Sequence, residues 1–173
     1  MTFKEVYQAD LNRFGGGIDN YTKTWLLFYR KTQFASNRII KKLYHVLLFW
    51  WSERHGIEVD YHVKCGPGLY IGHPHGITIN YQVVMGKNVN IHKNVTIGRE
   101  NRGTREGTPT IGNEVWIGIG STVVGNITIG DDVLIAPNSF VNCDIPDHSI
   151  VIGNPCKIIH RDNATEGYIN NKV

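Results

Sequence analysis

One spacing constrains the fold of this chain more than any other feature: apolar residues recur every six positions over much of its length. The longest series is Ile111, Ile117, Val123, Ile129, Ile135 and Val141. Two shorter series keep the same period, namely Ile79, Met85, Ile91 and Ile97, and the pair Cys65 and Ile71. The steps between the series are eight residues (Ile71 to Ile79) and fourteen residues (Ile97 to Ile111), each a multiple of six plus two. We therefore expect a short insertion within each step.

A period of six fits neither an α-helix, which repeats every 3.6 residues, nor a simple strand, which repeats every two. It indicates a flat face of a few extended residues followed by a corner, and three such faces complete a triangular coil. The apolar residue then stacks inside the prism on its equivalents in adjacent coils, while glycine suits the strained corner. An ordinary β-sandwich would instead predict turns about every 8 to 12 residues. The predicted fold is mainly β, a left-handed parallel β-helix over residues 57–160.

Residues 1–56 follow a different pattern and are predicted to form an N-terminal α-helical segment. An amphipathic helix is indicated by Ile39, Leu43, Val46, Leu47 and Trp50, with Ser36 or Asn37 as its N-cap and Gly56 at the expected C-cap. A shorter helix is expected over about residues 22–31. The apolar stripe of the later helix is expected to be buried against the end of the coil or another subunit. A membrane surface is the alternative, because Lys41 and Lys42 lie beside the stripe. Residues 161–173 are expected to be a C-terminal tail.

The composition favours a cytoplasmic protein. No window approaches the roughly 20 uninterrupted apolar residues of a membrane span, and the start MTFKEVYQAD lacks the basic and apolar regions of a signal peptide. The three cysteines include no CxxC pair, so neither a disulfide framework nor a zinc site is expected. The net charge is only +3, and we expect no nucleic-acid partner.

Two motifs add to the repeats. The block GPGLYIGHPHGITIN and the closing GNPCKII together resemble the serine O-acetyltransferase branch of the hexapeptide-repeat acyltransferases. The similarity covers about residues 56–160, and the short helical segment resembles members found in capsule and exopolysaccharide clusters. The resemblance implies a homotrimer, leaves open a dimer of trimers, and implies that acetyl-CoA lies in the groove between adjacent prisms.

The same resemblance implies that His73 is the catalytic base. In that family the catalytic histidine is followed after three residues by Gly-Ile, and GHPHGI keeps this spacing. A hydroxyl is a poor nucleophile until a base with a pKa near 7 removes its proton, and imidazole suits that role. A carboxylate that orients the imidazole is expected too. Glu58, fifteen residues before His73, and Asp60 are both candidates for it.

The acceptor is harder to predict because the chain departs from the family's pattern. Serine-specific members carry Asp before the catalytic histidine and an Arg-His pair after the loop, whereas this chain has Gly72 and the pair Gly107-Thr108. Serine's charged groups would then be desolvated without partners. We therefore expect a neutral acceptor such as a sugar or polysaccharide precursor, with L-serine as the alternative. The expected acceptor-binding residues are His75, Tyr81, His92 and Thr108, and the loop 99–110 either shapes this site or is solvated.

Donor binding is expected at corners of the coil. The positions that match the family's pantetheine channel are Gly118, Ile119, Gly120, Ala136 and Pro137, and Lys157 is expected to meet a CoA phosphate. Acetyl-CoA is thus the expected co-substrate, and no metal is expected. A metal-dependent hydratase is a weaker alternative, since it needs three converging histidines and the sequence lacks the required pair after His92. The third hypothesis is a trimeric binding protein without catalytic activity.

Overall fold

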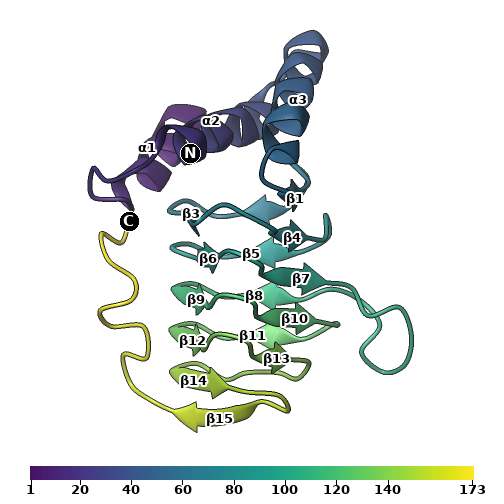
Figure 1. Ribbon diagram of the computed structural model, residues 1–173, viewed down its shortest axis with the longest axis vertical. Coiled ribbons are helices and arrows are strands. Elements are labelled where there is room, and N and C mark those ends of the chain that lie inside the picture. The colour runs from purple at the N-terminus through teal and green to yellow at the C-terminus, as the bar shows by residue number, and fades with distance from the viewer.

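The computed structural model describes all 173 residues, and its strands form three flat sheets that enclose a prism (Figure 1). Sheet A contains β1 (Glu58–Val59), β4 (Thr78–Ile79), β7 (Thr96–Gly98), β10 (Thr122–Val124) and β13 (Phe140–Val141). Sheet B contains β2 (Lys64–Cys65), β5 (Val84–Met85), β8 (Thr110–Ile111) and β11 (Thr128–Ile129). Sheet C contains β3 (Tyr70–Gly72), β6 (Asn90–His92), β9 (Val115–Ile117), β12 (Val133–Ile135), β14 (Ser149–Ile152) and β15 (Lys157–His160). All neighbouring strands are parallel except β15, which runs antiparallel to β14.

The pairing register confirms the sixfold spacing and both insertions. Regular coils pair residues 18 positions apart, such as Ile117 with Ile135. The offset rises to 20 between Ile71 and Ile91 and to 26 between Ile97 and Val123. The insertions are therefore two residues at 73–77 and eight residues in the loop 99–109, which projects from the prism (Figure 1).

The repeated apolar residues fill the inside of the prism. Ile91, Ile97, Ile117, Ile129 and Ile135 are fully buried, and burial of each such side chain stabilises the fold by about 1.5–3 kcal/mol. Because each one stacks on the equivalent residue of the next coil, the sequence period becomes a continuous core. The prediction of a parallel β-helix behind an N-terminal helical segment is confirmed. That residues 1–56, 57–160 and 161–173 are separate domains stays a prediction.

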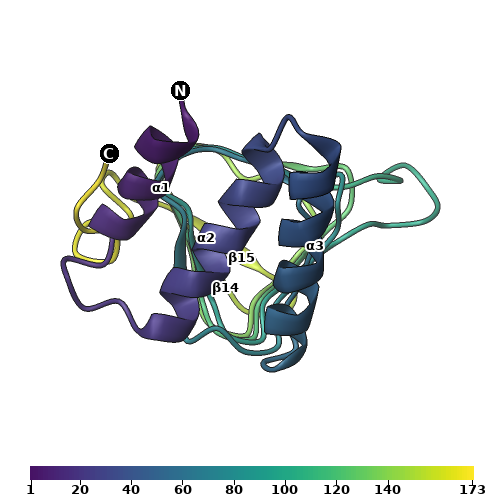
Figure 2. The same ribbon diagram turned by 90° about the horizontal axis from the view of Figure 1, so that it is seen from above.

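Three helices cover the open end of the prism rather than the two expected (Figure 2). They are α1 (Phe3–Asn12), α2 (Asn20–Phe34) and α3 (Arg38–Glu53). The helix expected at 22–31 is α2, which extends further at both ends. Asn37 caps α3 as predicted, and Gly56, with φ 61°, ends it in a Schellman turn in which the Ile57 N–H donates to the Ser52 carbonyl. No helix is long and apolar enough to cross a membrane.

The apolar stripe of α3 does not face the coil, so this part of the prediction is wrong. Ile39, Leu43 and Trp50 are 81%, 57% and 67% exposed, whereas the buried residues of the helix are Leu48 and Ser52. The face of the helix that carries these two buried residues is the one that packs against α2 and the first coil. Burial of the stripe against another subunit stays a prediction.

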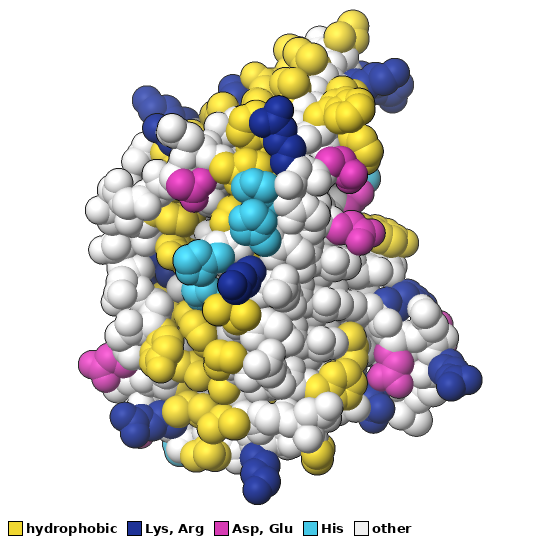
Figure 3. Space-filling view, viewed as in Figure 1, with side chains coloured by type: hydrophobic (Ala, Val, Ile, Leu, Met, Phe, Trp, Pro, Cys, Tyr) yellow, Lys and Arg dark blue, Asp and Glu magenta, His cyan; other side chains and the backbone are white.

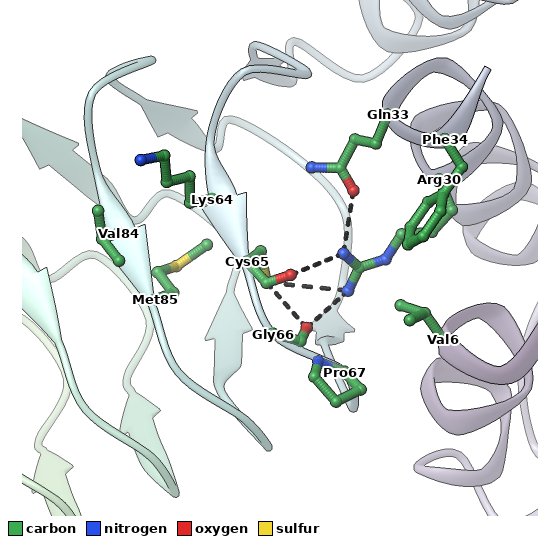
Figure 4. Close-up of a pocket in the computed structure, with 10 residues that line it drawn as sticks. All are labelled: Val6, Arg30, Gln33, Phe34, Lys64, Cys65, Gly66, Pro67, Val84 and Met85. Carbon is green, nitrogen blue, oxygen red and sulfur yellow. Dashed lines mark hydrogen bonds between the residues drawn. The ribbon is translucent and has the colours of Figure 1, made fainter. Parts of the chain in front are cut away.

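A buried ion pair fixes the helices to the first coil. Arg30 of α2 donates to both carboxylate oxygens of Asp10 on α1, at 2.7 and 3.1 Å. It also donates to the carbonyl oxygens of Cys65 and Gly66, as Figure 4 shows. Asp10 also accepts hydrogen bonds from the N–H groups of Gly68 and Leu69. Arg30, Cys65 and Gly66 also line a cavity of about 380 Å³, and no histidine lines it. The cavity is therefore part of the structural joint between the helices and the prism.

The C-terminal tail runs back along one edge of the prism towards the helices (Figure 1). Its amides at Ala164 and Thr165 donate to Asp132, its Val173 N–H donates to Asn88, and its Asn170 carbonyl accepts from Arg13. This edge, where the chain passes from sheet B to sheet C, is called the B–C edge below. The tail covers it from the last coil to the first.

Candidate active site

The predicted base His73 and the predicted donor residues lie along a single edge of the prism, where the chain passes from sheet C to sheet A, whereas the predicted carboxylates lie elsewhere on sheet A. This C–A edge consists of the turns at 73–77, 93–95, 118–121 and 136–139, and the turn 153–156 continues it in the last coil. Backbone hydrogen bonds link the successive turns: Asn94 N–H to His75 O at 2.9 Å, Gly120 N–H to Lys93 O at 3.1 Å, and Asn138 N–H to Ile119 O at 2.9 Å. Figure 3 shows histidines gathered in one column beneath the helices.

His73 lies in the two-residue insertion at the top of this edge. Each regular turn of the edge carries a left-handed residue at one equivalent position, occupied by Gly76, Asn94, Gly120 and Asn138. His73 is an additional left-handed residue, with φ 56°, and it is exposed. Such a backbone is uncommon for residues other than glycine and asparagine, and it persists only where the surrounding turn fixes it. The insertion therefore turns the His73 side chain outward at the edge.

Aromatic stacking holds the ring of His75 against a residue of the preceding coil. Its ring stacks on His55 at 4.1 Å, and His55 stacks in turn on Tyr21 of α2 at 3.6 Å. Burial, reinforced by the nearby His75, lowers the pKa of His55, whose Nδ1 is buried without a hydrogen-bond partner. The stacking of His55 between Tyr21 and His75 could not be predicted from the local sequence, because it depends on how the first coil packs against the helices.

His92 lies on β6, where it pairs in register with Gly72, the residue before His73. Burial, with the proximity of His73, lowers the pKa of His92 to about 4, so the ring is neutral at pH 7. Its Nε2 is buried and has no hydrogen-bond partner. The ring contacts Trp116, with centroids 4.7 Å apart, and Trp116 packs against Tyr168 of the tail at 5.1 Å. The prediction that His92 is near the site agrees with this position; its role in acceptor binding stays a prediction.

Three other predicted residues, Asp60, Tyr81 and Thr108, lie on the opposite border of sheet A, where the chain passes to sheet B. Asp60 accepts hydrogen bonds from His62, at 2.7 Å from the backbone N and 2.6 Å from the ring Nδ1. Glu58 lies on β1, where it pairs in register with Thr78, five residues after His73. Glu58, Asp60 and Tyr81 share a groove of about 680 Å³ between α3 and sheet A, which His73 does not line. Within one chain, neither carboxylate bonds to His73, so their orienting role stays a prediction.

The predicted donor positions lie lower on the C–A edge. A side chain at Gly118 would stand 2.6 Å from the backbone N of Pro137, so only glycine allows these turns to approach so closely. Gly120 has φ 71°, and the hydroxyls of Ser121 and Ser139 both donate to the Ala136 carbonyl. Ile119 is half-buried between these turns, and Lys157 is exposed directly after the last turn of the edge. The C–A edge therefore presents a regular backbone surface between His73 and Lys157.

The loop 99–110 contains two ion pairs between its own side chains. Arg99 pairs with Glu106 at 2.9 Å, and Arg105 pairs with Glu100 at 3.2 Å. No group of three or more His, Cys, Asp or Glu side chains in the chain could hold a metal ion.

Comparison with known proteins agrees with this geometry. Residues 108–143 match the family model described as bacterial transferase hexapeptide (six repeats). The chain is 38% identical over 107 residues to the serine acetyltransferase of Helicobacter pylori, which covers 62% of this chain and 63% of that protein. The chain therefore spans less than two thirds of the length of this relative.

Solved structures extend the similarity to the helices. The Neisseria gonorrhoeae serine acetyltransferase in complex with serine is 27% identical, with a TM-score of 0.72 over 91% of this chain and 69% of that one. The Brucella abortus serine acetyltransferase, at 24% identity, shares the fold with a TM-score of 0.79 over 94% of this chain and 71% of that one. This chain is a hexapeptide-repeat β-helix protein, similar in sequence and in fold to the serine acetyltransferases.

Proposed function

We propose that the protein is an acetyl-CoA-dependent O-acetyltransferase in which His73 is the general base. The observation that carries this proposal is the C–A edge, which aligns an exposed, outward-turned histidine with the close-packed turns at Gly118 and Pro137 and with Lys157. The similarity to serine acetyltransferases supports the same reaction.

The reaction needs three contributions from these residues. His73 accepts the proton of the acceptor hydroxyl as the hydroxyl oxygen attacks the thioester carbonyl, and it then returns the proton to the CoA thiolate. Backbone N–H groups of the edge stabilise the negative charge that develops on the carbonyl oxygen. Lys157 binds a phosphate of CoA. A homotrimer, in which a second prism faces this edge, would enclose the donor and bring the opposite border of sheet A within reach of His73.

L-serine is the first acceptor to consider. The relatives are serine acetyltransferases, and they support the serine alternative better than the sugar or polysaccharide acceptor favoured by the sequence. One observation still favours a neutral acceptor as a second candidate: the position before His73 is Gly72, and the space beside it is filled by a neutral His92.

The proposal is tested by measuring thiol release from acetyl-CoA with L-serine and with a panel of neutral sugars. His73→Asn is the informative variant, since asparagine tolerates the left-handed backbone at φ 56°. We expect it to keep its fold and CoA affinity and to lose a factor of about 10² to 10⁴ in rate. His148→Asn is the matched control, because His148 has φ 55° and lies exposed on the B–C edge, away from the C–A edge. Full activity of the His73→Asn protein would refute the assignment.

A further inference from the structure

We propose that His92 takes the place of the side chain that Gly72 lacks and forms a neutral wall of the acceptor subsite beside His73. The ligand class that fits this subsite carries an uncharged hydrogen-bonding group, such as a second hydroxyl, next to the hydroxyl that is acetylated. This inference rests on the proposed acetyltransferase function and deepens it, because it concerns what the same site accepts and favours the second candidate, a neutral acceptor, over L-serine.

The first step is steric. A Cβ atom at position 72 would stand 2.5 Å from Nδ1 and 2.6 Å from Cε1 of His92, and 3.1 Å from Cε1 of Tyr70. Real Cβ contacts are not this short, so a side chain at 72 and the observed ring position of His92 exclude each other. The two residues are register partners on β3 and β6, which is why residues 20 positions apart compete for one space.

The second step concerns how firmly the ring is held. Trp116 lies against one side of His92 at 4.7 Å, and Tyr70 lies 6.1 Å away. Trp116 is itself covered by Tyr168 of the C-terminal tail at 5.1 Å. The wall of the subsite therefore depends on a layer of aromatic side chains that reaches from the tail to Gly72.

The third step is electrostatic. His92 is neutral at pH 7 because burial, and then His73, lower its pKa to about 4. An acceptor ammonium placed against this wall would lose water without gaining an anionic partner, which is costly. A hydroxyl would instead find a neutral imidazole whose Nδ1 lies toward Gly72 and can form a hydrogen bond, while Nε2 is buried on the inner side of the ring.

The test introduces a carboxylate at position 72 in the space that the His92 imidazole occupies. In the double variant Gly72→Asp/His92→Ala, removal of the ring makes room for the new side chain. The matched control is Gly72→Asn/His92→Ala, which is nearly isosteric and uncharged. Binding of L-serine and of its uncharged analogue N-acetyl-L-serine amide is measured by calorimetry for each protein, after circular dichroism has verified the fold.

We expect the wild-type protein and the Asn control to bind L-serine no better than the neutral analogue. In the Asp double variant the preference for L-serine should rise at least about tenfold, the effect of one charge-assisted hydrogen bond. An unchanged preference, or no binding of serine by any of the three proteins, would overturn the inference. Failure of the proposed function is a separate result: no CoA binding and no thiol release by the wild-type protein with any acceptor.

Discussion

At the scale of single residues, Glu58 and Asp60 differ in what already binds them. Asp60 is occupied by the backbone and the ring of His62, whereas Glu58 is exposed on β1, one coil before the strand that follows His73. We expect Glu58→Gln to lower kcat by less than the His73 variant does and to leave KM unchanged, because a positioning carboxylate acts only as the base becomes charged.

The matched change Asp60→Asn should leave both constants near those of the wild-type protein, and Glu58→Asp should restore part of the lost kcat. These constants are measured by steady-state kinetics with acetyl-CoA. The opposite ranking, with Asp60→Asn the slower enzyme, would assign the role to Asp60 and remove Glu58 from the site.

What the sequence could reveal about residues depended on distance along the chain. His73 was proposed as the base because its motif is local, and the stacked turns at Gly118 and Ala136 followed from the sixfold register. The exclusion between Gly72 and His92, and the support from Trp116 and Tyr168, required the exact offset across the first insertion and the path of the tail. Neither the exclusion nor the aromatic support produces a local pattern in the sequence.

At the scale of elements, the buried pair of Asp10 and Arg30 is the main joint between the helices and the prism. Both side chains are fully buried, and removing the Asp10 carboxylate leaves the Arg30 guanidinium with neutral hydrogen-bond partners only and no opposite charge. We expect Asp10→Ala to lower the free energy of unfolding by about 3–5 kcal/mol. Arg99→Ala, which breaks an exposed pair in the loop 99–110, should change it by less than about 1 kcal/mol. Urea unfolding measures both, and equal midpoints for the two variants would contradict this assignment.

The same joint explains why the sequence did not predict α1. Its inward face carries Val6, Ala9 and Asp10, so a buried charge interrupts the apolar stripe that would have marked a helix. In α3 the stripe was recognised, but the end of the coil, one of the two surfaces expected to cover it, does not do so. A helical period indicates that apolar residues share one face of a helix, but it does not indicate what covers that face.

The exposure of that stripe predicts small effects on the stability of the chain itself. Leu43→Ser should cost less than about 0.5 kcal/mol, because the side chain is already 57% exposed. Ile97→Ala, in the fully buried column of the prism, should cost about 2–5 kcal/mol through the cavity that it leaves. Denaturant unfolding under dilute conditions distinguishes the two, and a loss of several kcal/mol for Leu43→Ser would show that the stripe is buried in the folded protein.

At the scale of the whole molecule, the three edges of the prism have different environments. The C–A edge carries His73, His75 and the turns proposed for the donor. The edge between sheets A and B carries Tyr81 and the projecting loop, and the B–C edge is covered by the tail. The coil was predictable from its period, but the path of the tail was not, because residues 161–173 bind through backbone amides and side-chain oxygens that have no repeat.

The tail's attachment should depend on pH through Asp132. Burial raises the pKa of this carboxyl, but hydrogen bonds from His148, Thr165 and Ala164 outweigh burial and hold the pKa below its usual value. A carboxyl with a lowered pKa stabilises the folded state above its unfolded pKa, about 4, and this stabilisation is lost as the pH falls through the folded value. His148 has the opposite sign: its hydrogen bond to Asp132 raises its pKa, so its contribution is complete below about 6.5 and is lost as the pH rises through the raised value.

Both groups are therefore charged, and the tail is held most firmly, between about pH 4 and pH 6.5. Hydrogen exchange of the Ala164 and Thr165 amides, corrected for the intrinsic rate, measures this directly. We expect protection to be greatest in that window and to fall steeply towards pH 3, and we expect Asp132→Asn to remove most of the decline. Asp162→Asn is the control, since the Asp162 side chain is 83% exposed at the start of the tail. Equal protection at pH 3 and pH 6 in the wild-type protein would mean that contacts such as Tyr168 on Trp116, rather than the carboxylate, hold the tail against the B–C edge.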